Sequence, residues 1–320
     1  MNHSVMPRRR DRRLITAVLA FASATSLACA RAATQSLPQR RTEVYLYEDT
    51  RRLVQFVENA AALVEQRGTA AFQEFDRAGS PWRTFGTYLF IYDLGGTCVW
   101  HGMNPELVGR NLLSLRDGLG KPVIQAITDV GRRPERDASD WVFYLWEEQT
   151  NLFPAWKASY IRKAVAPDGE VYLVGSGSSR VKVEKVFVRD RVDMAARLLQ
   201  ERGREVAFHN FKEPSSPFYF LGTFVFVLDR QGHSLVDPAY PTLDGRDMSG
   251  FRDAIGRPVI QELLQKLEKG DQAWVQFLWP RPGERLPSRK LMYARKVRVG
   301  DETLLVGSDF YLATPIWMKL

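Results

Sequence analysis

An internal duplication restricts the folds that this sequence can adopt. Residues 86–125 recur at 222–261 with a constant offset of 136, and 16 of the 40 aligned positions are identical. A repeat of this length indicates two copies of one domain, because solenoid repeats are much shorter. A chain of 320 residues also has room for two separate hydrophobic cores.

The duplication extends beyond these residues in both directions. Downstream, after a small deletion, 141–146 pairs with 274–279, 157–163 with 290–296, and 174–176 with 306–308. Upstream, 52–75 and 189–211 both show helical periodicity, and each contains an Arg-Gly pair. Each copy therefore begins with a long amphipathic helix.

Strands and one short helix are expected to follow the long helix in each copy. In the first copy the aromatic and β-branched residues predict strands at 87–92, 97–101, 141–146, 157–165 and 171–175. Pro122 and Pro258 stand where the first turn of a short helix accepts proline. This order predicts an α+β fold with an antiparallel sheet. The predicted domains are 40–182 and 185–316, after an export signal at 1–32.

The N-terminus has the pattern of an export signal. Arginines at 8–13 precede an uncharged run at 14–30, and small residues that suit cleavage follow. We expect a cleaved signal and a periplasmic or extracytoplasmic protein. Lipidation at Cys29 and an uncleaved membrane anchor are the alternatives. After residue 30 no other segment is long and apolar enough to predict a membrane span.

Composition and motifs argue against several functional classes. The net charge is +8, but much of it lies in the first 30 residues, which hold five arginines against one aspartate. The remaining chain shows no basic stripe of the kind that binds nucleic acid. The four histidines are scattered, and Cys98 is the only cysteine after Cys29, so no metal site or cofactor is predicted. A phosphate-binding glycine loop and the Gly-x-Ser-x-Gly motif are both missing. We therefore predict a non-enzymatic protein.

Taken together, the repeated motifs resemble those of a sensor family, the single Cache domain of type 2. They comprise an aromatic strand, an Asp-x-x-Gly turn, Pro-x-Leu-x-Gly-Arg, Asp-x-x-Gly-[Lys/Arg]-Pro, Trp-Val, Lys-x-x-Tyr and Val-Gly-Ser. The resemblance covers about 45–180 and 188–312. It implies two PAS-like extracytoplasmic sensor modules, each binding a small ligand on one face of its sheet. Each copy has its own helix, which fits tandem single modules better than the double-Cache arrangement.

The resemblance also implies a class of ligand and a partner. Cache domains often bind short organic acids and usually belong to chemoreceptors and sensor kinases. No signalling domain is expected within this chain, so a membrane-bound signalling protein is the expected partner. The alternatives are a cell-envelope scaffold whose pockets are filled by its own aromatic side chains, and a membrane-anchored accessory subunit.

Two repeated strands supply the main candidate ligand-binding residues. Side chains alternate along a strand, so Tyr160 and Arg162 share one face and Lys157 takes the other. A tyrosine hydroxyl and a cation beside a half-buried sheet would suit a carboxylate. The alternative is that the tyrosines fill the core and the lysines are exposed. The corresponding candidates of the second copy are Lys290, Tyr293 and Arg295.

Other candidates differ between the copies or lie in loops. Tyr88, His101 and Tyr144 change to Phe224, Asp237 and Phe277, which predicts different ligands or one inactive pocket, with the better pocket in the first copy. Aspartates of Asp-x-x-Gly sequences usually form turns, but they and the preceding arginines could also contact a polar ligand. Trp82 could close the first pocket. The loop candidates are Arg110, Asp117, Arg246 and Asp253.

Overall fold

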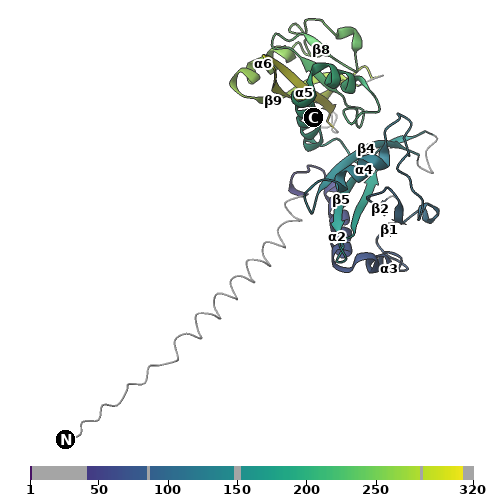
Figure 1. Cartoon of the computed structure of the whole chain (residues 1–320). Helices are drawn as coiled ribbons and strands as arrows, with labels where there is room; N and C mark the ends of the chain where they lie inside the picture. The colour runs from purple at the N-terminus through teal and green to yellow at the C-terminus, as the bar shows by residue number, and fades with distance from the viewer. Residues whose placement is uncertain (2–41, 85–86, 148–152, 282–283, 313–320) are drawn as a thin grey trace. The chain divides into compact units, whose positions relative to one another are not determined.

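The structure is a computed structural model that describes Met1 and residues 42–84, 87–147, 153–281 and 284–312 (Figure 1). The chain divides into two units, Met1–Val44 and Tyr45–Leu320. The second unit contains all the helices and strands discussed below. The predicted export signal lies outside the described residues, apart from Met1. In the part that the structure describes, no helix is both long enough and apolar enough to span a membrane.

The first copy forms a six-stranded antiparallel sheet that follows a long helix. Helix α2 is Glu48–Arg67, and a 3-10 turn leads from it into the short helix α3, Ala71–Phe75. The strand order is β1-β2-β6-β5-β4, and β3 pairs with β2. The strands are β1 Arg83–Thr84, β2 Thr87–Asp93, β3 Cys98–His101, β4 Ser139–Trp146, β5 Ala155–Val165 and β6 Val171–Ser178.

The second copy repeats this arrangement. Helix α5, Lys185–Lys212, precedes a sheet with the order β8-β7-β11-β10-β9. This order matches β3-β2-β6-β5-β4 strand for strand, which confirms the predicted α+β fold of two PAS-like modules. The strands are β7 Val225–Leu228, β8 Ser234–Val236, β9 Gln272–Pro280, β10 Pro287–Val299 and β11 Glu302–Tyr311.

The repeated Arg-Gly pair marks a break in each long helix. Gly68 ends α2 with a φ of 57°, and Gly203 interrupts α5 with a φ of 76° and a ψ of 178°. Both glycines have positive φ, which side chains with a Cβ rarely adopt. The first long helix is therefore shorter than the 52–75 predicted from periodicity, because the chain turns at Gly68 before α3.

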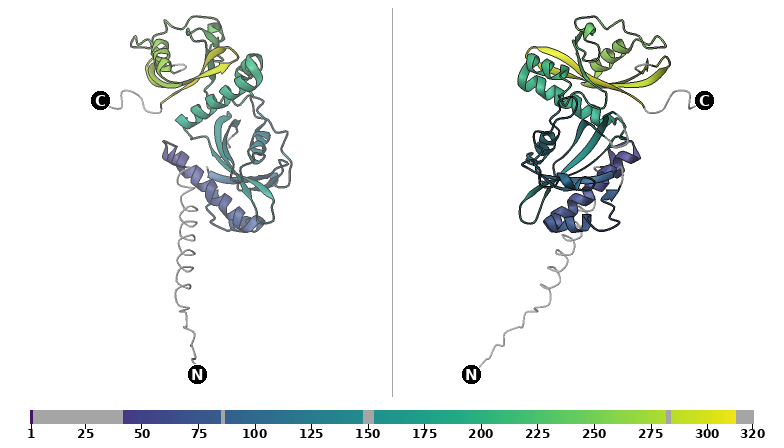
Figure 2. Two further views of the ribbon diagram at one scale, coloured as in Figure 1. Left: turned by 60° about the vertical axis from the view of Figure 1, so that its left-hand side comes forward. Right: turned by 90° about the vertical axis from the view of Figure 1, so that its right-hand side faces the viewer.

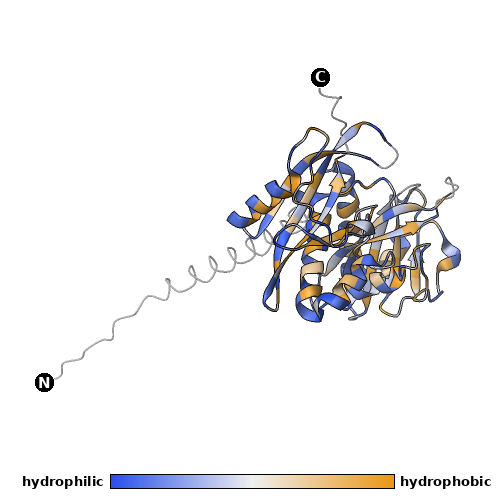
Figure 3. Cartoon of the chain, turned by 90° about the horizontal axis from the view of Figure 1, so that it is seen from above, coloured by the Kyte–Doolittle hydropathy of each residue, from blue (hydrophilic) through white to orange (hydrophobic). Residues whose placement is uncertain are grey.

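Each sheet is covered on both faces by helices. The long helix packs on one face, and a short helix that follows the repeated proline packs on the other. These short helices are α4, Val123–Gly131, and α6, Val259–Lys269. Figure 2 shows the long helix beside the first sheet, and Figure 3 shows that hydrophobic and hydrophilic residues alternate along the helices. One buried cluster forms beneath the long helices, and a separate one forms under each short helix.

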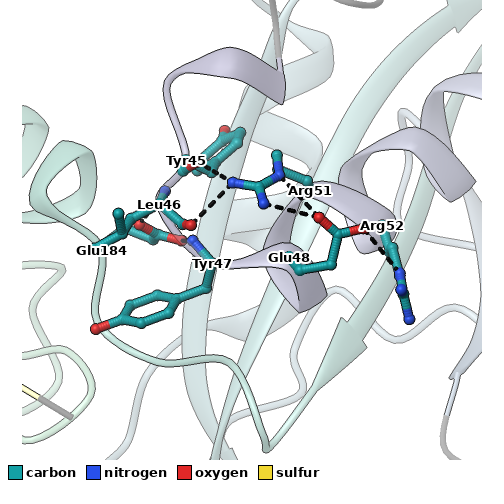
Figure 4. A network of polar contacts seen from close by, with 7 residues as sticks. All are labelled: Tyr45, Leu46, Tyr47, Glu48, Arg51, Arg52 and Glu184. Carbon is teal, nitrogen blue, oxygen red and sulfur yellow. Dashed lines mark hydrogen bonds and ion pairs between the residues drawn. The ribbon is translucent and has the colours of Figure 1, made fainter. Parts of the chain in front are cut away.

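The start of α2 is held by a carboxylate from the segment that joins the two copies. Glu184, the N-cap residue of α5, is 1% exposed and accepts the backbone N–H groups of Leu46 and Tyr47, at 2.8 and 3.0 Å (Figure 4). Arg51 binds the carbonyl oxygens of Tyr45 and Leu46 and the carboxylate of Glu48. The first N–H groups at the start of a helix have no partner within the helix. The bonds from Glu184 and Arg51 hold the backbone just before Glu48, so they fix where α2 begins.

Candidate functional site

The face of each sheet beneath the short helix carries a lysine, which is buried in the first domain and partly exposed in the second. Lys157 on β5 and Lys290 on β10 occupy equivalent positions, and both point to this face. The alternation that predicted opposite faces for Lys157 and Tyr160 is confirmed, because Tyr160 belongs to the cluster under the long helix. We call this face the short-helix face.

In the second domain a cavity of about 340 Å³ lies on the short-helix face. Its walls combine aromatic rings with a few polar groups, as small-molecule sites do. The ring of Phe251 lies 5.0 Å from that of Trp279 and 6.3 Å from that of Phe277. The aromatic lining residues are Phe226, Tyr240, Phe251, Phe277 and Trp279, and the polar ones are Ser234, Asp237, Lys290 and Asp309.

The charged groups of this cavity interact with one another. Lys290 Nζ lies 2.8 Å from Asp309 Oδ1. Burial alone would lower the pKa of Lys290, but the carboxylate of Asp309 outweighs it and the pKa is raised. Burial raises the pKa of Asp237, and the nearby charge of Asp309 adds to this effect. The lining thus holds one ammonium and two carboxylates.

The equivalent residues of the first domain form a different polar cluster. Lys157 Nζ donates to the Tyr88 hydroxyl at 2.8 Å and lies 4.6 Å from the centre of its ring. The Tyr144 hydroxyl is 2.8 Å from Ser159 Oγ, and the ring of His101 lies 5.2 Å from that of Tyr88. The structure therefore brings four sequence-predicted candidates together: Tyr88, His101, Tyr144 and Lys157.

His101 and Asp237 perform the same structural task despite their different charges. His101 Nδ1 accepts the backbone N–H groups of Met103 and Asn104, and Asp237 Oδ1 accepts those of Ala239 and Tyr240. The turn after β3 or β8 is thus fixed by a side-chain acceptor in both copies. The difference between His101 and Asp237 therefore keeps the acceptor for the turn but changes the charge near the lysine, which is Lys157 in the first copy and Lys290 in the second.

Five predicted residues lie on the opposite face, against the long helix. The Tyr160 hydroxyl donates to Glu58 at 2.7 Å, and Arg162 pairs with Glu58 and Glu65, so α2 itself supplies the carboxylates. In the second domain Tyr293 donates to Gln272, and Arg295 pairs with Asp193 of α5. The fifth residue, Trp82, packs its ring 4.9 Å from that of Phe56 on α2.

The loop candidates are occupied with turn formation or exposed. Asp117 accepts the N–H groups of Leu119, Lys121 and Leu145, and Asp253 accepts those of Ile255, Arg257 and Leu278. Each aspartate thus fixes its turn and ties it to β4 or β9. The side chains of Arg110 and Arg246 are exposed. Neither loop candidate of the second domain, Arg246 or Asp253, is among the residues that line the second-domain cavity.

Sequence reasoning missed Asp309 and most of the aromatic lining. Asp309 follows the repeated Val-Gly-Ser segment, where the first copy has Gly177. This difference was readable in the alignment of the two copies. Trp279, Phe251 and Tyr240 gave no comparable signal, because aromatic residues at such positions usually belong to a core. In the part that the structure describes, no group of histidine, cysteine, aspartate or glutamate side chains could hold a metal ion.

The glycine of the repeated Val-Gly-Ser segment makes room for an aromatic ring. Gly175 pairs with Phe90, and Gly307 pairs with Phe226, on the neighbouring strand. A Cβ at Gly307 would overlap Phe226 Cζ and lie 2.8 Å from Tyr293 O. The ring of Phe226, which lines the cavity, therefore covers the glycine.

Gly307→Ala is expected to lower the free energy of unfolding by about 1–3 kcal/mol, because overpacking displaces a ring or a strand. The displaced ring would also narrow the cavity. Urea unfolding measures the first effect. Gly250→Ala is the matched control, because a Cβ there meets nothing within 4 Å. Equal stability of the two variants would contradict the prediction.

Each half of the chain matches a family model of a Cache domain, and the two models differ. The model described as Single Cache domain 2 matches residues 199–312, and the model described as Cache domain matches residues 84–179. The methyl-accepting chemotaxis protein McpP of Pseudomonas putida is 31% identical over 89 residues, which is 28% of this chain. The match covers only 16% of that protein's length.

Solved structures of sensor domains also resemble parts of the chain. A methyl-accepting chemotaxis protein from Vibrio parahaemolyticus is 21% identical over 40% of this chain and 88% of its own, with a TM-score of 0.34. A Cache chemosensory domain described for carboxylic acid recognition is 21% identical over 38% of this chain and 84% of its own, with a TM-score of 0.32.

Proposed function

We propose that this chain, which carries two Cache domains in tandem, binds small molecules outside the cytoplasm and passes their presence to a membrane-bound signalling protein. The observation that carries the proposal is the cavity of about 340 Å³ on the short-helix face of the second sheet. It holds a largely enclosed lysine, aromatic walls and a few convergent polar groups. This is the usual composition of a small-molecule site.

For the first domain we propose a small organic acid as the ligand. Lys157 is 4% exposed, and it shares the short-helix face with the hydroxyls of Tyr88 and Tyr144. An ammonium and hydroxyl donors suit the oxygens of a carboxylate. His101 is also part of this cluster, and burial together with the charge of Lys157 lowers its pKa to about 4. The imidazole is therefore neutral at pH 7.

The cellular setting is part of the same proposal. The N-terminal pattern supports export to the periplasm, and the similarity to a chemotaxis receptor supports a membrane-bound partner. A scaffold with both pockets filled by the chain's own side chains fits less well, because the second domain has a cavity. An anchored accessory subunit requires an uncleaved N-terminal segment, which the intact mass of the exported protein would reveal.

Isothermal titration of the exported protein against short carboxylates, amino acids and amines tests the proposal. We expect at least one compound to bind and to raise the unfolding temperature. Lys157→Met is expected to weaken carboxylate binding at least tenfold, because the ligand loses its charged partner. Carboxylate binding that survives this change would contradict the site in the first domain. If neither heat nor a thermal shift appears with any compound, the sensor function is excluded for this panel and the scaffold hypothesis gains support.

A further inference from the structure

We infer that the cavity of the second domain takes a small ligand that carries an ammonium group. This inference rests on the proposed function, because it assumes that the cavity binds a ligand. It differs from the organic acid proposed for the first domain. Three features of the lining carry it: the balance of charge, the aromatic walls and an unpaired hydroxyl.

The balance of charge disfavours a free carboxylate as the ligand. Lys290 is the only cation among the described lining residues, and its ammonium is already paired with Asp309. Asp237 adds a second carboxylate, so an entering anion would meet net negative charge. An entering ammonium would instead add counter-charge beside the half-buried carboxylate of Asp237, which otherwise shares Lys290 with Asp309.

The backbone holds the Asp237 carboxylate in place. Its Oδ1 accepts the N–H groups of Ala239 and Tyr240, at 3.1 and 3.0 Å, and both bonds lie within the turn after β8. Burial raises the pKa of this carboxyl and the charge of Asp309 adds to the rise, although the two backbone N–H groups and the charge of Lys290 oppose it. A carboxylate fixed in this way is a good partner for a cation, because little reorganisation accompanies binding.

The aromatic walls favour the same kind of ligand. Ammonium groups are attracted to the faces of aromatic rings, and aromatic cages recognise organic cations in this way. The ammonium of Lys290 already lies 5.0 Å from the centre of the Tyr311 ring and 5.9 Å from that of Phe277. Of these two rings Phe277 lines the cavity, so one cation, that of Lys290, already lies near an aromatic wall.

One hydroxyl in the lining lacks a partner in the part that the structure describes. Ser234 is 2% exposed, and its Oγ makes no hydrogen bond there. The equivalent residue of the first domain is Cys98, which is a weak hydrogen-bonding group. A ligand N–H could satisfy this buried oxygen, which is otherwise costly to leave unpaired.

The first domain lacks both acids. His101 replaces Asp237, and Gly177 replaces Asp309. A Cβ at Gly177 would overlap Ser159 Oγ and lie 2.9 Å from Lys157 Cε, so these two side chains occupy the space that an acidic side chain would need. The two copies thus present opposite charges on the same face of the same fold.

Titration of matched compounds into the full exported chain tests the inference. The probes are propylamine with propionate, butylamine with butyrate, the zwitterions β-alanine and γ-aminobutyrate, and choline. Lys157→Met serves as the background, so that carboxylate binding by the first domain does not mask the second. In this background we expect at least one ammonium-bearing probe to bind and neither carboxylate to do so.

Two further changes locate the effect. Asp237→Asn keeps an oxygen that can accept the two backbone N–H groups, and we expect it to weaken ammonium binding at least tenfold. Asp309→Asn releases Lys290, and we expect it to weaken ammonium binding and to allow carboxylate binding. Unchanged ammonium binding in Asp237→Asn would contradict the inference.

The possible outcomes separate this inference from the proposed function. Carboxylate binding without ammonium binding in the Lys157→Met background would overturn the inference and leave the sensor function standing. If no probe binds either the wild type or the Lys157→Met protein, the inference and the sensor function both fail for ligands of this size. Circular dichroism of each variant shows that the fold is retained.

Discussion

Replacing Arg162 with alanine is expected to lower the free energy of unfolding of the first domain by about 3–5 kcal/mol. The guanidinium is 8% exposed and lies between Glu58, which is 9% exposed, and Glu65. Its removal takes away the positive charge that pairs with the buried carboxylate of Glu58, which also accepts the Tyr160 hydroxyl. Urea unfolding followed by tryptophan fluorescence measures the change.

The second domain provides a matched control at the equivalent position. Arg295 also pairs with a carboxylate of the long helix, but the Arg295 and Asp193 side chains are 37% and 27% exposed. Solvent screens such a pair, so Arg295→Ala is expected to cost about 0–1 kcal/mol. A loss as large as that of Arg162→Ala would show that the arginine contributes mainly through packing of its methylene groups.

A double replacement separates charge from packing in the first domain. Glu58→Leu combined with Arg162→Met removes both charges and keeps apolar volume, and such exchanges are often neutral or stabilising. We therefore expect the double variant to recover most of the stability that Arg162→Ala loses. If it is no more stable than the single variant, the lost charge pair with Glu58 is not the cause of the lower stability.

Strand periodicity correctly separated Lys157 from Tyr160 and Arg162. It could not show which face is available to a ligand, because helices cover both faces of the sheet. The carboxylate expected as a ligand of Tyr160 and Arg162 comes from Glu58, which is about 100 residues earlier in the chain. The position of Glu58 depends on how α2 docks, and local sequence does not determine that.

The second-domain site shows the same limit. Lys290 and Asp237 were identified from the repeat, but Asp309 acquires its importance only from strand register. The pairing of Met292 with Asp309 brings this aspartate beside Lys290 on the next strand. The turn aspartates Asp117 and Asp253, by contrast, follow from local chemistry. Each accepts three backbone N–H groups, as the Asp-x-x-Gly pattern suggests.

The better pocket was expected in the first copy because it has more hydroxyl groups. Among the described residues, those hydroxyls are engaged with neighbours, as the Tyr88–Lys157 and Tyr144–Ser159 contacts show. The second copy has phenylalanine at the positions of both tyrosines, and methionine at that of Ser159. These side chains cannot form the hydroxyl contacts seen in the first domain, and the cavity of the second domain lies on this face.

Stability of the first domain is expected to fall between about pH 6.5 and pH 4 because of His101. Burial and, to a smaller extent, the charge of Lys157 lower the pKa of His101 from 6.5 to about 4, although Glu106 opposes the shift. In this pH range the unfolded chain binds a proton at His101 and the folded chain does not. The free energy of unfolding therefore decreases as the pH falls, and the decrease stops below the folded pKa.

The expected loss is on the order of 3 kcal/mol, given about 1.4 kcal/mol for each unit of pKa shift. Carboxylates titrate near the lower end of this range, so the useful quantity is the difference between wild type and His101→Asn. Asparagine keeps an oxygen that can accept the N–H groups of Met103 and Asn104 but does not titrate. Urea unfolding at pH 7.5, 6.5, 5.5 and 4.5 should show a smaller decrease for the variant. Parallel decreases would mean that other groups control the acid sensitivity, and that His101 is not held neutral beside Lys157.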